Sequence, residues 1–294
     1  MDWLISALGA GLVLLGLRDI FHTLWHPTAR KSLGRHLMRL IWRLSRRTGR
    51  RRHASTLAGP LAMVAVVCTW TSVIVLGWAL IYWPHLPDGF VFAAGLDVGR
   101  RMDLLDALYL SLVTVATLGF GDIVPTAGWL RIAAPMQALI GFVLLTATVS
   151  WVLQIYPTLM RRRALAIKLS VLRRSDADGW LAHTDSPFAA VLLDDLATKV
   201  AQACVDFAQY AESYYFHDGE DQASLPVTIG YAASLAERGQ ASRQADVRLA
   251  ATMLAHALED LAAVLDQRFL RVGGNTSAVF HAYAADHGRP SAQD

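Results

Sequence analysis

Long apolar runs alternate with short basic stretches in the first half of the chain. A helix that spans a bilayer needs about 20 predominantly apolar residues. Three stretches are long enough, from Trp3 to Trp25, from Leu61 to Trp83 and from Leu130 to Tyr156. A fourth run, Leu104 to Ala116, is too short to cross, so we expect it to enter the membrane and turn back. The pattern predicts an all-α membrane protein.

The second half of the chain, from Thr158 onward, has a different pattern. Apolar residues recur at helical spacing from Ser186 to Gly219, from 225 to 238 and from 242 to 270, which is typical of amphipathic helices. A short helix is expected at 277–285. No alternating strand pattern interrupts these segments, so the tail is predicted to be a helical bundle.

A glycine-containing segment, Thr117-Leu118-Gly119-Phe120-Gly121-Asp122, lies between the short apolar run and the third long one. Backbone that is neither helix nor barrel is tolerated at membrane depth only where it is buried in protein or lines a water-filled path. Glycine adopts positive φ easily, which lets consecutive carbonyl groups turn to one side. Together with the threonine hydroxyl, such a ladder of oxygens can replace the water around a dehydrated monovalent cation.

The stretch from Asp106 to Pro125 resembles the pore helix, selectivity filter and outer mouth of tetrameric potassium channels. Leu118 and Phe120 stand where the T-V-G-Y-G filter of that family has Val and Tyr. The order of pore helix, filter and following span matches as well, which makes the resemblance more specific than an isolated G-x-G would be.

The resemblance implies a homotetramer with potassium ions on its axis and no cofactor. The filter would bind K⁺ through carbonyl oxygens of Thr117, Leu118, Gly119 and Phe120 and through the Thr117 hydroxyl, while Gly121 and Asp122 would shape the outer mouth. Some members of the family carry a glutamate at the position of Val113, which pairs with the outer aspartate, and many carry a glutamate at the position of Gln137. Neither is present here.

The third span resembles the inner helix of such channels around a hinge glycine, Gly141. A glycine at mid-span is also typical of close helix packing, so both interpretations stay open. Pro157 is expected to end the span. Helical spacing from Gly141 gives the candidates for the cavity and a hydrophobic gate, namely Phe142, Leu145, Thr146, Val149 and Leu153.

These observations divide the chain into four expected domains. A basic amphipathic linker and an ion-channel pore domain follow an added N-terminal transmembrane helix, and a cytoplasmic helical domain ends the chain. The boundaries are 1–28 for the N-terminal helix, 29–58 for the linker, 59–157 for the pore domain (outer helix 61–83, pore helix 104–116, filter 117–122, inner helix 130–156) and 158–294 for the helical domain.

Basic residues predict how the chain is oriented in the membrane. Arg30, Lys31 and eight further arginines up to Arg52 lie between the first two spans, with no acidic residue among them. Positive loops stay cytoplasmic, so the N-terminus is expected outside and the C-terminus inside. The economy of the chain and its similarity to prokaryotic channels indicate a bacterial inner membrane. Residues 32–47 are expected to form an amphipathic helix on the inner leaflet, where it is either a simple anchor or a site for anionic lipid at Arg35, Arg39, Arg43, Arg46 and Arg47.

Composition narrows the functional classes. The chain has 294 residues, 54% of them hydrophobic, and a net charge of +3. Basic residues expected at the inner surface of the membrane account for this positive charge, so binding to nucleic acid is not expected. Nucleotide-binding, catalytic and metal-ligand motifs are missing, so an enzyme is not expected, and the ligand or protein partner of the tail stays open. The alternatives to a selective potassium channel are a poorly selective monovalent cation channel and a membrane-tethered signalling or scaffold protein with a silent pore.

Overall fold

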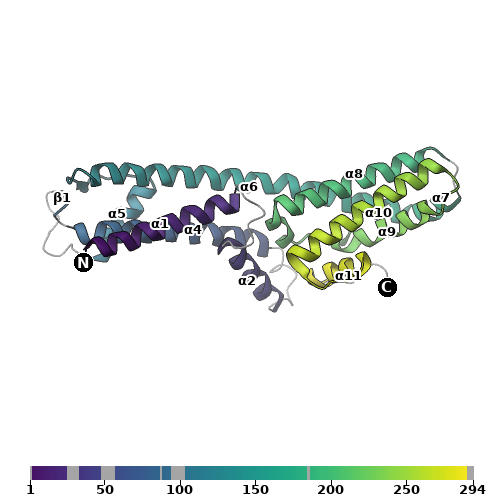
Figure 1. Ribbon diagram of the computed structural model, residues 1–294, viewed down its shortest axis with the longest axis horizontal. Coiled ribbons are helices and arrows are strands. Elements are labelled where there is room, and N and C mark those ends of the chain that lie inside the picture. The colour runs from purple at the N-terminus through teal and green to yellow at the C-terminus, as the bar shows by residue number, and fades with distance from the viewer. Residues whose placement is uncertain are drawn as a thin grey trace. The chain divides into compact units, whose positions relative to one another are not determined.

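The computed structural model describes residues 2–24, 33–47, 57–86, 88–93, 103–183 and 186–289. It divides into two compact units. One unit comprises Met1–Leu37 and Met63–Leu153, and the other comprises Met38–Ala62 and Gln154–Asp294. Each unit is built almost entirely from helices, so the predicted all-α membrane fold is confirmed (Figure 1).

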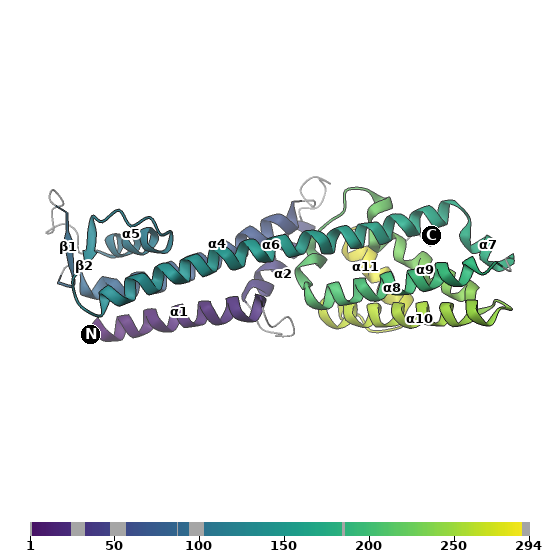
Figure 2. The same cartoon turned by 90° about the horizontal axis from the view of Figure 1, so that it is seen from above.

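The first unit contains the apolar helices. Three helices are long and apolar enough to cross a membrane, α1 (Asp2–Leu24), α4 (Ala58–Tyr82, extended by the 3₁₀ turn η1 at Trp83–His85) and α6 (Leu130–Arg174). A shorter apolar helix, α5 (Leu104–Val115), lies beside the start of α6 (Figure 2). Two short strands, β1 (Phe90–Phe92) and β2 (Ile123–Pro125), pair antiparallel with Val91 opposite Val124.

Helix α1 packs along α4 through small residues. A Cβ atom placed on Gly9 would lie 2.4 Å from the carbonyl oxygen of Gly77, and one on Gly77 would lie 2.7 Å from a methyl group of Val13. Polar contacts hold both ends of this pair. The Ser6 hydroxyl is 3.1 Å from the His85 ring, and the Trp70 indole donates to the Asp19 carboxylate at 2.9 Å. Helix α1 is therefore held along α4 by close packing in the middle and by polar contacts at both ends.

Helix α6 does not end at Pro157, where the sequence analysis placed its end. It continues without interruption to Arg174. Proline removes one backbone hydrogen bond and usually kinks or breaks a helix interior. Here the neighbouring side chains Ile155 and Leu159 are almost completely buried, so packing on both sides of the proline keeps the helix intact.

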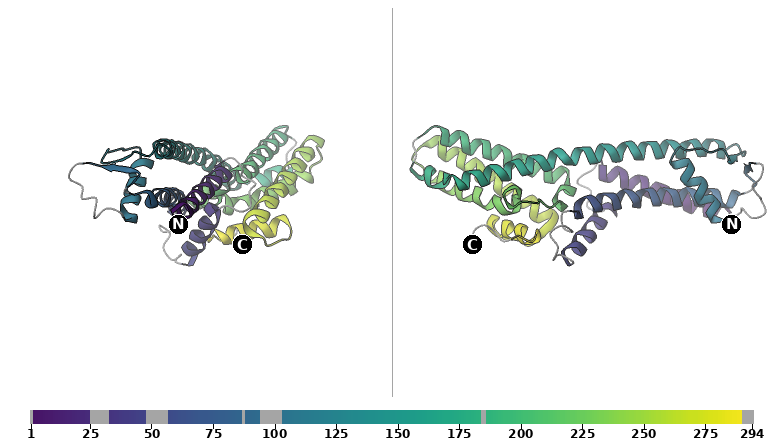
Figure 3. Two further views of the ribbon diagram at one scale, coloured as in Figure 1. Left: turned by 60° about the vertical axis from the view of Figure 1, so that its left-hand side comes forward. Right: turned by 180° about the vertical axis from the view of Figure 1, so that it is seen from behind.

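The second unit is a helical bundle, as predicted for the tail (Figure 3, green to yellow). Helix α10 packs against α8 and α9, and α11 packs against α9 and α10. The boundaries differ from the expected ones, because α8 ends at Gln209 and α10 gives way to a π-helical turn at Asp266. The elements are α7 (Ala177–His183), α8 (Phe188–Gln209), η3 (Ala211–Tyr215), η4 (Asp221–Ala223), α9 (Leu225–Gln240), α10 (Ala245–Leu265), η5 (Asp266–Leu270) and α11 (Thr276–Asp286). Helix α2 (Leu33–Arg47) contributes its residues from Met38 onward.

Candidate ion pathway

The pore helix α5 begins at a strong cap. The Asp103 carboxylate accepts from the backbone N–H groups of Leu105 and Asp106, at 3.1 and 3.2 Å, and it satisfies donors that a helix start otherwise leaves unpaired. At the other end of α5, the N–H groups of Thr117 and Leu118 bond back to its last turn, so the helix fixes where the filter segment starts.

The filter segment has an alternating backbone. Thr117, Gly119 and Gly121 have φ values of +57°, +54° and +78°, so every second residue is left-handed. This conformation costs little for glycine and is strained for threonine. Among the residues that the structure describes, no N–H or O–H group donates to the carbonyl oxygens of 117–121. These oxygens are free to bind a cation.

The outer end of the filter is held by two contacts that the sequence analysis missed. The Tyr109 hydroxyl donates to the Asp122 carboxylate at 2.6 Å, and the Ala93 backbone N–H donates to the Asp122 carbonyl at 2.8 Å. Tyr109 comes from α5, one helical turn before Val113. A tyrosine thus anchors the outer aspartate. The separation of 13 residues between Tyr109 and Asp122 was the one signal in the sequence that could have suggested this contact.

A buried polar network joins the three helices behind the filter. Gln137 of α6 donates to the hydroxyl and carbonyl oxygens of Ser111 on α5, at 2.8 and 3.0 Å. The Tyr82 hydroxyl of α4 donates to the Gln137 side-chain oxygen at 2.7 Å, and Ser111 donates to the Val75 carbonyl at 2.9 Å. All three polar side chains are fully or almost fully buried, so the glutamine takes part in bracing the pore helix between its neighbours.

Gly141 lies at a close helix contact. A Cβ atom on this residue would be 2.0 Å from the Val115 carbonyl oxygen, at the end of α5. The lack of a side chain is therefore required by packing between α5 and α6. The hinge role of Gly141 stays a prediction.

The candidate gate residues lie on the uncovered side of α6. Phe142, Leu145, Val149 and Leu153 are 61%, 63%, 50% and 63% exposed in the single chain. Thr146 is also exposed, and its hydroxyl donates to the Phe142 carbonyl at 2.9 Å. Their exposure leaves this apolar face available to neighbouring copies or to a pore.

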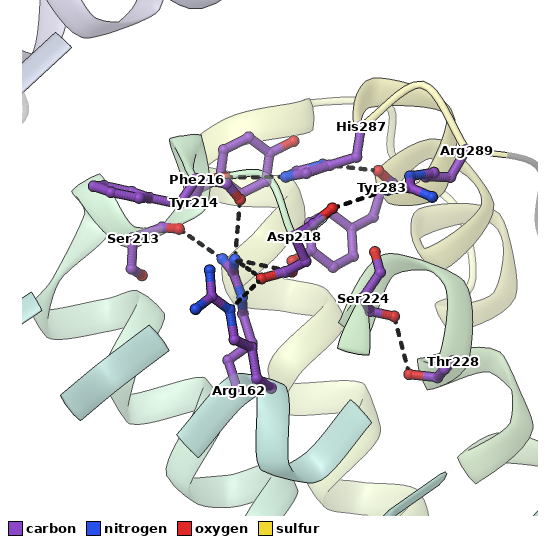
Figure 4. Close-up of polar contacts among 11 residues, drawn as sticks. Arg162, Ser213, Tyr214, Phe216, Asp218, Ser224, Thr228, Tyr283, His287 and Arg289 are labelled. Carbon is purple, nitrogen blue, oxygen red and sulfur yellow. Dashed lines mark hydrogen bonds and ion pairs between the residues drawn. The ribbon is translucent and has the colours of Figure 1, made fainter. Parts of the chain in front are cut away.

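Consecutive arginines on α6 bind the C-terminal helices (Figure 4). Arg162 is 3% exposed and donates to the Ser213 and Phe216 carbonyl oxygens, at 2.6 and 2.9 Å, and to Asp218. Arg163 donates to the same carboxylate at 2.8 Å. The structure gives these arginines a clear role, because they connect α6 to the segment after α8.

A histidine lies next to this arginine network. The two ring nitrogens of His287 are 3.1 Å from the Tyr283 carbonyl oxygen and 3.0 Å from the Tyr214 carbonyl oxygen. Burial lowers the pKa of His287 to about 4, with further lowering by the charges of Arg162 and His217. The ring is therefore neutral at neutral pH and donates to only one of the two carbonyls.

Helix α2 packs against the same cluster through Trp42. The indole stacks on the His217 ring with centroids 4.5 Å apart, and its N–H donates to Asp286 at 2.9 Å. Asp286 also accepts from the Tyr214 hydroxyl at 2.7 Å. The sequence analysis expected α2 to lie on the inner leaflet, and this expectation is incomplete. One apolar face of α2 is buried in protein, while Leu40 and Leu44 remain about half exposed.

The basic residues proposed as a lipid site are only partly described. Arg43 is exposed, and Arg39 lies beside Tyr215, where its charge opposes the rise in the tyrosine pKa that burial causes. The side chains of Arg35, Arg46 and Arg47 lie outside the described residues. Within the described part of the chain, no group of three His, Cys, Asp or Glu side chains could hold a metal ion.

Comparison with known proteins finds an ion-channel family that the region around the filter matches. Residues 69–156 match a family model described as "Ion channel". An uncharacterized membrane protein, YdjJ of Bacillus subtilis, is 26% identical over 53% of this chain and 46% of its own length. Two-pore potassium channel 5 of Arabidopsis thaliana is 38% identical over 19% of this chain and 15% of its own.

A third relative, protein LctB of Geobacillus stearothermophilus, is 33% identical over 27% of this chain and 61% of its own length. The chain thus covers between about one seventh and three fifths of these relatives. No solved structure matches it. The matches confirm the resemblance to potassium channels for the region that contains the filter.

Proposed function

We propose that the chain forms a potassium-selective channel as a homotetramer, from the premise that residues 69–156 match an ion-channel family model and that a two-pore potassium channel is among the relatives of the chain. One filter segment per chain cannot surround an ion. Four copies around an axis bring four sets of carbonyl oxygens from Thr117, Leu118, Gly119 and Phe120 into rings that replace the hydration shell of K⁺.

The observation that carries this proposal is the alternating backbone of the filter. Positive φ at 117, 119 and 121, and carbonyl groups to which no described residue donates, leave a row of oxygens available for a ligand. The exposed apolar face of α6 supports the homotetramer, because an uncovered stripe of large hydrophobic side chains is typical of an interaction site.

The same proposal assigns roles to the rest of the pore. Gly121 and Asp122 shape the outer mouth, and Phe142, Leu145, Thr146, Val149 and Leu153 line the cavity and form a hydrophobic gate, with Gly141 as a hinge. The N-terminus lies outside a bacterial inner membrane and the C-terminal helices lie in the cytoplasm, since basic residues dominate the segment between α1 and α4.

The tail and the linker are the proposed regulators. Arg162 and Arg163 connect α6 with the C-terminal helices, so a ligand or protein that binds those helices would act on the inner helix directly. Anionic lipid is proposed to contact α2 through Arg43 and its basic neighbours, next to the exposed Leu40 and Leu44.

Substitution of the filter glycines tests the proposal. Gly119→Ala and Gly121→Ala place a side chain at positive φ, where alanine is strained by about 1 kcal/mol or more, and should abolish K⁺ flux into liposomes without preventing membrane insertion. Gly128→Ala is the matched control, because Gly128 has no positive φ and no heavy atom within 4 Å of an added Cβ. Undiminished flux through either filter variant would contradict the proposal.

A poorly selective cation channel is the second candidate, and the retained Gly-Phe-Gly sequence disfavours it. A membrane-tethered signalling protein with a silent pore is the third. Ion flux separates all three, because the second conducts Na⁺ and K⁺ alike and the third conducts neither.

A further inference from the structure

From Tyr156 onward, α6 has an apolar face that no residue described by the structure covers. Tyr156, Met160, Ile167 and Val171 are 59%, 69%, 48% and 44% exposed, and Ala164 is exposed between them. The opposite face is covered, since Leu165 and Leu169 are at most 1% exposed. We call the five exposed residues the α6 seam.

The α6 seam is a straight stripe. At 3.6 residues per turn, its five members fall within an arc of about 80°. Their spacing of four, four, three and four residues is close to the heptad pattern by which parallel helices pack. At the same 3.6 residues per turn, four of the candidate gate residues fall within this arc as well, namely Phe142, Thr146, Val149 and Leu153.

The length of α6 carries this stripe out of the bilayer. Its 45 residues span about 67 Å at 1.5 Å per residue, roughly twice the hydrocarbon core of about 30 Å. The seam would then face water, where contiguous large apolar side chains usually mark an interaction surface.

The charges beside the seam identify the occupant. Arg161 and Lys168 lie on one edge of the arc and Arg163 on the other, and repulsion between identical basic helices would normally keep them apart. Each of these cations is paired inside its own chain. Arg161 binds Asp206 through two bonds of 2.9 and 2.6 Å, Arg163 binds Asp218, and Lys168 binds Asp195.

The ionised state of the Asp195 carboxylate supports its ion pair with Lys168. Partial burial alone would raise the pKa of Asp195, but hydrogen bonds from Lys168 and Lys199 outweigh burial and lower it. The carboxylate therefore stays ionised, and the edge of the seam remains neutralised at neutral pH.

We propose that the α6 seam packs against the α6 seams of other copies of this chain and forms a parallel helical bundle below the pore. The inference rests on the proposed homotetramer, which places identical helices side by side in the same direction. The bundle would transmit movements of the C-terminal helices to the pore, because Arg162 and Arg163 hold those helices on the opposite side of α6.

Cross-linking of the full chain in liposomes tests the proposal. In a Cys68→Ser, Cys204→Ala background, Ile167→Cys should give a disulfide-linked dimer band under mild oxidation, and adding Met160→Glu should abolish that band. Val205→Cys is the matched control, since Val205 is 58% exposed on α8, is not a member of the seam and should give no band. Amine cross-linking of the same samples reports the oligomeric state independently.

The outcomes separate this inference from its premise. A tetramer in which Ile167→Cys fails to cross-link, or cross-links no better than Val205→Cys, overturns the bundle and leaves the homotetramer standing. A monomer overturns both. A tetramer with a selective Ile167→Cys band that Met160→Glu removes supports the bundle.

Discussion

At the scale of single residues, the pore depends on polar side chains that are completely enclosed. Gln137 has 0% exposure and uses both its oxygen and its nitrogen, with Tyr82 as the donor and Ser111 as the acceptor. A buried polar group without a partner costs about 1–3 kcal/mol, so the three residues stabilise the pore unit only as a complete set.

Removal of one hydroxyl tests this network. Tyr82→Phe leaves the Gln137 oxygen without its donor and should destabilise the purified protein by about 1–3 kcal/mol, measured as a lower temperature of thermal unfolding. Tyr210→Phe is the control, because no described group bonds to the Tyr210 hydroxyl. Equal unfolding temperatures of wild type and Tyr82→Phe would show that the network contributes no stability.

The sequence predicted some residue roles and missed others for a physical reason. Positive φ at Gly119 and Gly121 follows from the residue type, because glycine is the residue for such conformations. The bond from Tyr109 to Asp122 and the network around Gln137 join residues from different elements, and their geometry exists only after those elements pack.

At the scale of elements, close packing of complementary surfaces holds α1 against α4, whereas the hydrophobic effect contributes little between helices in lipid. Lipid chains are as apolar as the helix surface, so close contact through small residues drives such packing. Gly9 and Gly77 provide that contact here.

Two glycines of α1 allow a matched test. Gly9→Ala forces a Cβ to within 2.4 Å of the Gly77 carbonyl oxygen, whereas Gly11→Ala has no atom within 4 Å of its Cβ. Overpacking of this kind costs about 1–3 kcal/mol, so Gly9→Ala should lower the unfolding temperature and Gly11→Ala should not. Equal effects of the two variants would contradict the packing described for α1.

The His287 cluster predicts a pH effect on the C-terminal helices. Burial next to Arg162 holds the pKa of His287 at about 4 in the folded protein, below the value of about 6.5 in an unfolded chain. The neutral ring is thus favoured by folding. The stabilisation is complete above pH 6.5 and is lost as the pH falls towards 4.

Thermal unfolding of the full chain between pH 7 and pH 4 measures this effect. Stability should fall with pH, and the fall should be smaller in His287→Gln. His256→Gln serves as the control, because that side chain is 71% exposed beside Glu259. An unchanged pH dependence in His287→Gln would assign the acid sensitivity to other groups.

Element boundaries show where sequence patterns stop being informative. Pro157 is a reasonable helix end by composition, yet α6 passes through it because Ile155 and Leu159 are buried on either side. Similarly, the basic amphipathic pattern of α2 fits a lipid surface and a protein surface equally well. Only the fold shows that Trp42 faces protein.

At the scale of the whole molecule, the proposed tetramer combines a filter that needs several copies with a long helix that we propose holds those copies together. The sequence around the filter carries the family resemblance, and the match over residues 69–156 supports it. The tail has no recognisable motif, so its contacts with Arg162 and Trp42 could be found only in the folded structure.

The proposed filter must select potassium over sodium, and the reversal potential of the reconstituted protein measures this selectivity. With K⁺ on one side of a planar bilayer and Na⁺ on the other, we expect a reversal potential close to the potassium equilibrium potential. A reversal potential near zero would overturn the proposed selectivity, because it would show that the filter passes both ions alike.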